Sequence, residues 1–253
     1  MVGKKNLVGN MQGLKIAILG LGEAGSRFAN DLVDLGVQIT GYDPQLIQTL
    51  DSRVQLAASA FAAVQGADII LSVNLSSVSI ELAEELKDHL QPEQFFCEMN
   101  TSGPEKKKKI ATVLEASGVQ VIDLAIMAPV PPKGIFTPLL ASGIHTEAFL
   151  QRIKPLNLAI SSVENGVIGD AATRKLLRSI VYKGMAAVIC EAMEAGEAFG
   201  METYIRSQIS SLIGGNDELI DRFVEGSKMH AKRRKDEMEA VIEMLEAKGI
   251  DPL

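Results

Sequence analysis

Short apolar runs alternate with helical patterns along the first two thirds of the chain. The runs are short and rich in branched side chains, which is typical of buried strands. They lie at residues 14–20, 37–43, 54–59, 68–75, 95–100, 119–127, 138–143 and 156–161.

Between these runs the apolar residues take the spacing of helices. The helical patterns cover residues 23–36, 60–66, 76–90 and 104–118. Pro104 is a helix start signal, and Gly36 and Gly118 are stop signals. This alternation predicts an α/β fold of the Rossmann type, with a doubly wound parallel sheet.

The second part of the sequence is helical only. One long, mostly apolar pattern covers residues 171–200, and two more helical stretches follow near 202–213 and 217–248. The change of pattern predicts two domains, at residues 1–165 and 166–253. A long interdomain helix is expected to open the second, smaller, all-helical domain.

Composition and charge exclude several classes of protein. Hydrophobic residues make up 47% and charged residues 23% of the 253 residues, as in ordinary globular proteins. A net charge of −7 argues against a nucleic-acid partner. No apolar run is long enough to cross a bilayer, and the segment after Lys4 and Lys5 is too polar for a signal peptide. We therefore predict a cytoplasmic protein with no membrane partner.

Two cysteines and two basic runs have simple expected roles. Cys97 and Cys190 lie in apolar surroundings and are expected to be small core residues. The lysines of 106–109 and the run KRRK at 232–235 are expected to be solvated helix faces.

A glycine-rich turn follows the first predicted strand, in the segment KIAILGLGEAGSRFANDL at 15–32. Its residues are Gly20, Leu21, Gly22, Glu23, Ala24 and Gly25. The first glycine of such a loop permits the sharp turn, the second lets the backbone approach a pyrophosphate, and the third lets the helix pack closely on the strand. The N–H groups at the start of the helix attract phosphate.

Asp43 supplies the acidic residue that such a loop needs at the end of the second strand, about 20 residues further on. Its carboxylate would accept hydrogen bonds from ribose hydroxyls and would repel a 2′-phosphate. The sequence therefore predicts that residues 1–165 bind a dinucleotide, with NAD favoured over NADP.

Four longer blocks carry a family resemblance: GLGEAGSRFANDLVDLG, CEMNTSGP, DLAIMAPVPPKGIFTPLLASG and GDAATRKLLRS. In this order they resemble the β-hydroxyacid dehydrogenase superfamily, which includes 6-phosphogluconate and 3-hydroxyisobutyrate dehydrogenases. The stretches MAPVPPKG, KLLRSIVYKGMAAVICEA and HAKRRKDEME resemble a phosphogluconate-dehydrogenase-like branch that has a C-terminal domain of unknown function. The resemblance implies that the helical domain serves substrate binding and dimerisation.

The superfamily has an invariant lysine in a G-x-G-x-x-x-K context, where it is the general acid/base. The matching run begins at Gly169 and ends at Lys175, so the resemblance gives this role to Lys175. An amine suits the task, because it can take the hydroxyl proton as hydride leaves for the nicotinamide. The implied activity is an NAD(P)-dependent oxidoreductase acting on the CH–OH group of a small hydroxy or keto acid.

The expected substrate residues depart from the superfamily pattern. Ser179 stands where the superfamily has a substrate-binding asparagine, and Ser179 and Tyr182 share a helix face with Lys175. The superfamily's substrate loop reads D-x-P-V-S-G-G, and its last three positions are here Met127, Ala128 and Pro129. A thioether replaces the serine hydroxyl, and proline removes a backbone donor. We infer that the substrate is not a standard 3-hydroxy acid: it is larger, less polar, or presents its anion elsewhere.

Other expected site residues follow from the same resemblance. The end of the fourth strand is expected to cradle the nicotinamide ribose, through Val73, Asn74 and Leu75. Thr101 matches a superfamily threonine near the nicotinamide. His230 is predicted on a helix face with Arg233 and Arg234, where it would meet a substrate anion. The three histidines lack ligand spacing, so no metal site is predicted.

Two alternatives stay open at this point. An imine reductase shares the layout but usually lacks the lysine, and a non-catalytic NAD(P)-binding or sensing protein would explain the altered substrate loop. A homodimer through the helical domain is expected, because the long helix is apolar nearly all round. Related sequences commonly continue with another helix after KGIDPL, so either the chain is short or a partner covers the exposed surface.

Overall fold

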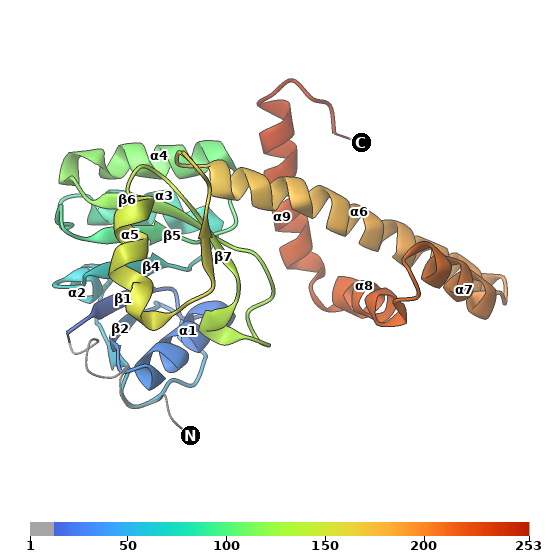
Figure 1. Ribbon diagram of the computed structural model, residues 1–253, viewed down its shortest axis with the longest axis horizontal. Coiled ribbons are helices and arrows are strands. Elements are labelled where there is room, and N and C mark those ends of the chain that lie inside the picture. The colour runs from blue at the N-terminus through green and yellow to red at the C-terminus, as the bar shows by residue number, and fades with distance from the viewer. Residues whose placement is uncertain (1–12, 253) are drawn as a thin grey trace. The chain divides into compact units, whose positions relative to one another are not determined.

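The computed structural model describes residues 13–252, and its first part is built on one eight-stranded sheet. Figure 1 shows this sheet with helices packed on its faces. The sheet order is β3-β2-β1-β4-β5-β6-β7-β8. The strands are β1 (Lys15–Leu19), β2 (Gln38–Tyr42), β3 (Gln55–Leu56), β4 (Ile69–Ser72), β5 (Phe95–Glu98), β6 (Gln120–Ile126), β7 (Leu139–Ser142) and β8 (Ile160–Ser162).

The two faces of the sheet carry separate hydrophobic cores. In β1, Ile16 and Ile18 point into one core while Ala17 and Leu19 point into the other, because strand side chains alternate. The first core is covered by α1 (Glu23–Asp34) and α5 (Thr146–Ile153). The second is covered by α2 (Ala60–Val64), α3 (Ser79–Leu86) and α4 (Pro104–Leu114). This arrangement confirms the predicted Rossmann-type, doubly wound sheet.

One part of the sheet differs from the wholly parallel prediction. β7 pairs antiparallel with β6, whereas the remaining neighbours pair in parallel. A parallel neighbour requires a crossover connection, usually a helix. The segment between β6 and β7 contains only the short 3-10 turn η4 (Gly134–Phe136), so the chain turns back beside β6.

The chain divides into two compact units after Lys175, inside α6 (Asp170–Ala198). The second unit continues with α7 (Glu202–Leu212), α8 (Asp217–Met229) and α9 (Ala231–Glu246). The single helix predicted over 217–248 was wrong, because His230 leaves helical geometry (φ −118°, ψ 27°) and separates α8 from α9. Two small cores hold this unit together, one around Ile220 and Phe223 and one around Leu176 and Val241.

The cysteines differ in their environment. Cys97 on β5 is fully buried, which confirms its prediction as a core residue, and burial raises the pKa of its thiol. Cys190 on α6 is half-buried, with its Sγ 3.6 Å from the carbonyl oxygen of Phe223. Neither thiol is paired in a disulfide.

Candidate cofactor and proton-transfer site

The glycine loop lies against the end of β4, and two of its glycines are required by close backbone contacts. Gly20 has φ +99°, and a Cβ at this position would lie 2.5 Å from the carbonyl oxygen of Val73. A Cβ at Gly25 would lie 1.9 Å from the carbonyl oxygen of Gly20. These contacts hold the start of α1 tightly between β1 and β4.

Gly22 has the opposite environment. It is the N-cap of α1, where no side chain caps the helix, and a Cβ built on it meets nothing within 4 Å. The N–H groups at a helix start carry partial positive charge and bind phosphate when no side chain satisfies them. The open space above Gly22 therefore fits the pyrophosphate of a dinucleotide.

Asp43 follows β2 and faces the same loop. Its Oδ2 accepts a hydrogen bond from the N–H of Leu21 at 2.7 Å, and its Oδ1 accepts one from the N–H of Gln45 at 2.8 Å. An ionised carboxylate has about four acceptor positions. Two of these acceptor positions are used by the backbone N–H groups that fix Asp43 beside the loop. The other two remain to accept hydrogen bonds from ribose hydroxyls.

The end of β4 supplies the next part of the same edge. A Cβ at Gly20 would lie 2.8 Å from the Cα of Asn74 as well as close to Val73, and the side chain of Leu75 is largely exposed. Asn74 Oδ1 accepts a hydrogen bond from Asn100 Nδ2 at 2.8 Å, which joins the ends of β4 and β5.

Lys175 and Thr101 meet although they are far apart in sequence. Lys175 Nζ donates a hydrogen bond to Thr101 Oγ1 at 2.7 Å. Thr101 follows the carboxyl end of β5, and Lys175 lies in the second turn of α6. In open α/β sheets, ligands bind at this carboxyl edge. The structure therefore brings the predicted acid/base residue to one predicted cofactor residue.

The start of α6 is held by two side chains from the sheet. Ser142 Oγ accepts a hydrogen bond from the N–H of Ala171 at 3.0 Å, and Asp123 Oδ2 accepts one from the N–H of Ala172 at 2.9 Å. Gly169, just before the helix, has φ +100°, and a Cβ there would lie 2.9 Å from Pro104 Cβ. These contacts fix the turn from which Lys175 projects.

The expected substrate loop is anchored at both ends. The Met127 side chain packs beside Ala125, Leu140 and other members of a small buried cluster. Ala128 is half-buried and Pro129 is exposed. Further along, Asp31 Oδ2 on α1 accepts a hydrogen bond from the N–H of Ile135 at 2.9 Å.

The other expected substrate residues lie in the second unit and have partners there. Ser179 Oγ donates to Glu237 Oε1 at 2.5 Å, and Lys183 forms an ion pair with the same carboxylate. Burial lowers the pKa of Lys183 although Glu237 opposes the shift. The ring of Tyr182 packs edge-on against Phe223, with centroids 4.9 Å apart.

His230 does not share a helix face with Arg233 and Arg234 as predicted, because it ends α8 and precedes α9. Arg234 Nη1 donates to Ser227 Oγ at 2.5 Å. A substrate-binding role for Ser179, Tyr182 and His230 stays a prediction.

A buried charge cluster beside this site was not predicted from the sequence. Lys107 was expected on a solvated helix face, but its side chain is 1% exposed and ion-paired with Glu98 and Asp123. The spacing contained a signal, since Lys107, Ile110 and Leu114 lie on one helix face and all three are buried. Burial lowers the pKa of Lys107, but the two carboxylates raise it more, so the net shift is upward. Burial also raises the pKa of Glu98 against the attraction of Lys107.

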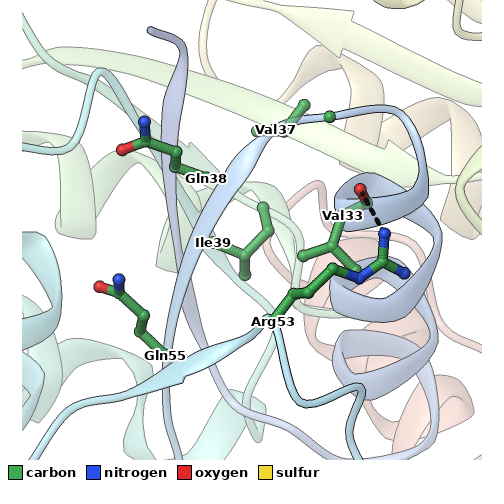
Figure 2. Close-up of a pocket in the computed structure, with 7 residues that line it drawn as sticks. Val33, Val37, Gln38, Ile39, Arg53 and Gln55 are labelled. Carbon is green, nitrogen blue, oxygen red and sulfur yellow. Dashed lines mark hydrogen bonds between the residues drawn. The ribbon is translucent and has the colours of Figure 1, made fainter. Parts of the chain in front are cut away.

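A cavity of about 350 Å³ lies away from this edge. Figure 2 shows Val37, Gln38 and Ile39 from the amino end of β2 along its wall, with Arg53 and Gln55 beside them. Arg53 is held there by ion pairs with Asp34 and Asp51. In open α/β sheets, ligands bind at the carboxyl ends of the strands, whereas this cavity lies at the amino end of β2. It is therefore not the dinucleotide site.

Within residues 13–252 no group of histidine, cysteine and acidic side chains is arranged to hold a metal ion. In the same range, no helix is long and apolar enough to cross a membrane.

Comparison with known families accounts for most of both units. Residues 15–130 match the NAD binding domain of 6-phosphogluconate dehydrogenase, and residues 197–253 match a domain of unknown function, DUF1932. A 3-hydroxyisobutyrate dehydrogenase from Pseudomonas aeruginosa is 23% identical over 211 residues, which cover 80% of this chain and 70% of that protein.

Solved structures share the same fold. One is a conserved protein of unknown function described as similar to 3-hydroxyacid dehydrogenases, with a TM-score of 0.74, 27% identity and coverage of 95% of this chain and 92% of that one. A Mycobacterium tuberculosis 3-hydroxyisobutyrate dehydrogenase has a TM-score of 0.76 at 19% identity, covering 94% and 89% of the two chains. An imine reductase from Myxococcus stipitatus has a TM-score of 0.66 at 21% identity, covering 84% and 77%.

Proposed function

We propose that this chain is an NAD(P)-dependent oxidoreductase of the 3-hydroxyacid dehydrogenase-like family. Residues 15–130 match the NAD binding domain of 6-phosphogluconate dehydrogenase, and the chain is similar to a 3-hydroxyisobutyrate dehydrogenase, which supports this proposal. It transfers a hydride between the nicotinamide and a small hydroxy or keto acid, acting on the CH–OH group. The observation that carries this proposal is the 2.7 Å hydrogen bond from Lys175 Nζ to Thr101 Oγ1 at the carboxyl edge of the sheet.

Lys175 is the proton donor and acceptor of the proposed reaction. The nicotinamide supplies hydride chemistry when it is bound. In the oxidation, the neutral amine of Lys175 accepts the hydroxyl proton of the substrate, and in the reduction the ammonium returns a proton to the developing alkoxide. Thr101 accepts a hydrogen bond from Lys175, so its own hydroxyl hydrogen is left to donate to a second group.

The cofactor is held by the loop that begins at Gly20 and by Asp43. The N–H groups after Gly22 would face the pyrophosphate, and Asn74 lies on the nicotinamide side of the same edge. The substrate would lie near Met127, Ala128 and Pro129, with Ser179, Tyr182 and His230 as further proposed contacts.

Asp43 sets the preference for NAD in this proposal, and an Asp43→Asn variant tests it. Asparagine keeps an acceptor for the N–H of Leu21 and removes the charge that repels a 2′-phosphate. We expect the ratio of NADP to NAD affinity to rise about tenfold, the size of a charged hydrogen-bond contribution. Titration of both cofactors by calorimetry measures it. Asp34→Asn, which alters a carboxylate paired with Arg53, is the control and should leave the ratio unchanged.

The substrate class is tested by a panel of small hydroxy acids, sugar acids and their phosphates, each with NAD and NADP. Formation of the reduced cofactor is followed by absorbance. Turnover of at least one member supports the proposal. Turnover of a standard 3-hydroxy acid in preference to all others would contradict the inference drawn from Met127, Ala128 and Pro129.

Imine reduction is the second candidate, supported by the shared fold of the imine reductases. Cyclic imines belong in the same panel, and reduction of imines without oxidation of any hydroxy acid would favour this activity. NADH binding without any turnover would favour a sensing role instead.

We propose that a second copy of the chain binds the exposed apolar face of α6. Leu177, Val181, Met185 and Val188 are all substantially exposed and repeat at helical spacing. Exposed apolar patches of this kind mark association surfaces. We also propose a cytoplasmic location, in which this face meets only water or a partner.

The dimer is tested by light scattering on a chain of 27.1 kDa. The wild type should have twice this mass, and Val181→Asp should shift the population toward the single-chain mass, because a charge in an apolar contact is costly. Leu212→Asp, at an exposed position at the end of α7 outside this face, should stay dimeric. A wild-type mass of one chain would contradict the proposal.

A further inference from the structure

Lys107, Glu98 and Asp123 form a charge cluster inside the first unit. Their side chains are at most 2% exposed. Lys107 Nζ forms an ion pair with the carboxylate of Glu98, donates to the backbone carbonyl of Glu98 at 3.0 Å, and lies 3.3 Å from Asp123 Oδ1. The cluster joins α4 to the end of β5 and the middle of β6, and the proposed reaction does not use it.

Fold stability alone does not explain this cluster. Removing charges from water is costly, and well-packed apolar residues of similar volume often give equal or greater stability. Lys108 and Lys109, the next residues on the same helix, are exposed, so the burial of a cation is particular to position 107. The cluster calls for a role that apolar side chains could not perform.

One side of the cluster leads to Thr101. Asn100 Nδ2 donates to Glu98 Oε1 at 2.5 Å and to Asn74 Oδ1 at 2.8 Å, which uses both amide hydrogens and fixes the orientation of the side chain. Thr101 is the next residue along the backbone. The position of the Thr101 hydroxyl is therefore tied to Glu98 and, through it, to Lys107.

The other side of the cluster leads to Lys175. Asp123 Oδ2 accepts hydrogen bonds from the N–H of Ala172 and from Ser142 Oγ, and this places the first turn of α6. Lys175 follows Ala172 by about one helical turn. Lys107 thus bridges the carboxylate that orients Thr101 and the carboxylate that anchors the helix of Lys175.

We propose that Lys107 is a positioning residue that sets the contact between Lys175 and Thr101 by linking Glu98 to Asp123. This inference rests on the proposed role of Lys175. Lys107 makes its polar contacts with Glu98 and Asp123, and it acts through the end of β5 and the start of α6.

Two variants of the full chain separate positioning from stability. Lys107→Met leaves two buried carboxylates without their cation and is expected to lower the melting temperature. The double variant Glu98→Gln with Lys107→Met removes the Glu98–Lys107 pair and keeps an acceptor for Asn100. Asp123 stays charged but keeps its hydrogen bonds from Ser142 and Ala172, so the melting temperature is expected to recover in large part. Lys108→Met, exposed on the same helix, is the control and should match the wild type.

Activity and lysine reactivity are then measured on these proteins. In the double variant we expect kcat to stay at least about tenfold below the wild type, because small misplacements of reacting groups are costly. We also expect acetylation of Lys175 by acetic anhydride, relative to Lys109 in the same chain, to rise about fivefold as its hydrogen bond loosens. Mass spectrometry of peptides gives this ratio without any substrate.

The outcomes distinguish this inference from the proposed function. Recovery of both kcat and the Lys175 acetylation ratio together with the melting temperature would show that the cluster only stabilises the fold, and would overturn the inference. If the wild type turns over no substrate, the proposed function fails, and the Lys175 acetylation ratio alone tests whether Lys107 sets the contact between Lys175 and Thr101. If Lys107→Met does not fold, the kcat and the Lys175 acetylation ratio of the double variant provide the test.

Discussion

Lys175→Met is expected to lower kcat by about 10²–10⁴-fold while the Kd for NADH stays within about twofold of the wild type. This range is the usual contribution of a positioned acid/base group. Methionine approximates the length of lysine but cannot take or give a proton, and Lys175 donates to Thr101 rather than to the glycine loop. Steady-state kinetics with the substrate found in the panel and calorimetry with NADH measure the two quantities.

Lys183→Met is the comparison for this variant. Lys183 lies two turns further along α6, has a lowered pKa and is paired with Glu237, so it is the other lysine of the helix suited to proton transfer. We expect Lys183→Met to reduce kcat less than Lys175→Met does. Full activity of Lys175→Met, together with loss of activity in Lys183→Met, would move the acid/base role to Lys183.

Gly25→Ala is expected to lower the free energy of unfolding by about 3 kcal/mol, which is the cost of severe overpacking. A Cβ at this position would lie 1.9 Å from the carbonyl oxygen of Gly20, so backbone has to move. For a chain of this size the melting temperature should fall by roughly 6 °C or more. Differential scanning calorimetry measures this change directly.

Gly22→Ala is the matched variant with the opposite expected result. Its Cβ meets nothing within 4 Å, and the residue has φ −67°, so stability should change by less than about 1 kcal/mol. The same Cβ would occupy the space assigned to the pyrophosphate, and NADH affinity should fall at least about tenfold. Wild-type NADH affinity in Gly22→Ala would show that the pyrophosphate does not bind above this residue.

Local chemistry explains why much of the fold could be predicted from the sequence. Residues close in sequence determine the glycine turn, the strand before it and the helix after it. A local sequence pattern is therefore enough to predict them. The direction of β7 does not depend on its own residues. The direction of β7 is set by the connection before it, which contains η4 rather than a crossover helix. The apolar pattern of residues 138–143 predicts a strand but not its direction.

The site is predictable only in part, for a related reason. The loop at Gly20 and the acidic residue at Asp43 follow a spacing rule, whereas the contact between Lys175 and Thr101 joins residues 74 positions apart. Lys175 was assigned from family resemblance, and no spacing within this chain would have selected it. Lys107 was missed because the charged run containing it predicts a solvated face, while its burial depends on carboxylates contributed by β5 and β6.

The division of the chain inside α6 has a consequence for protein engineering. Lys175 closes the first compact unit, and Thr101 and the glycine loop belong to the same unit. In the proposed function, the proton-handling pair is thus encoded in the same unit as the proposed cofactor loop, and the second unit begins at Leu176. Chimaeras that exchange residues 176–253 between relatives are therefore expected to retain the proposed reaction type while they vary the proposed substrate contacts at Ser179, Tyr182 and His230.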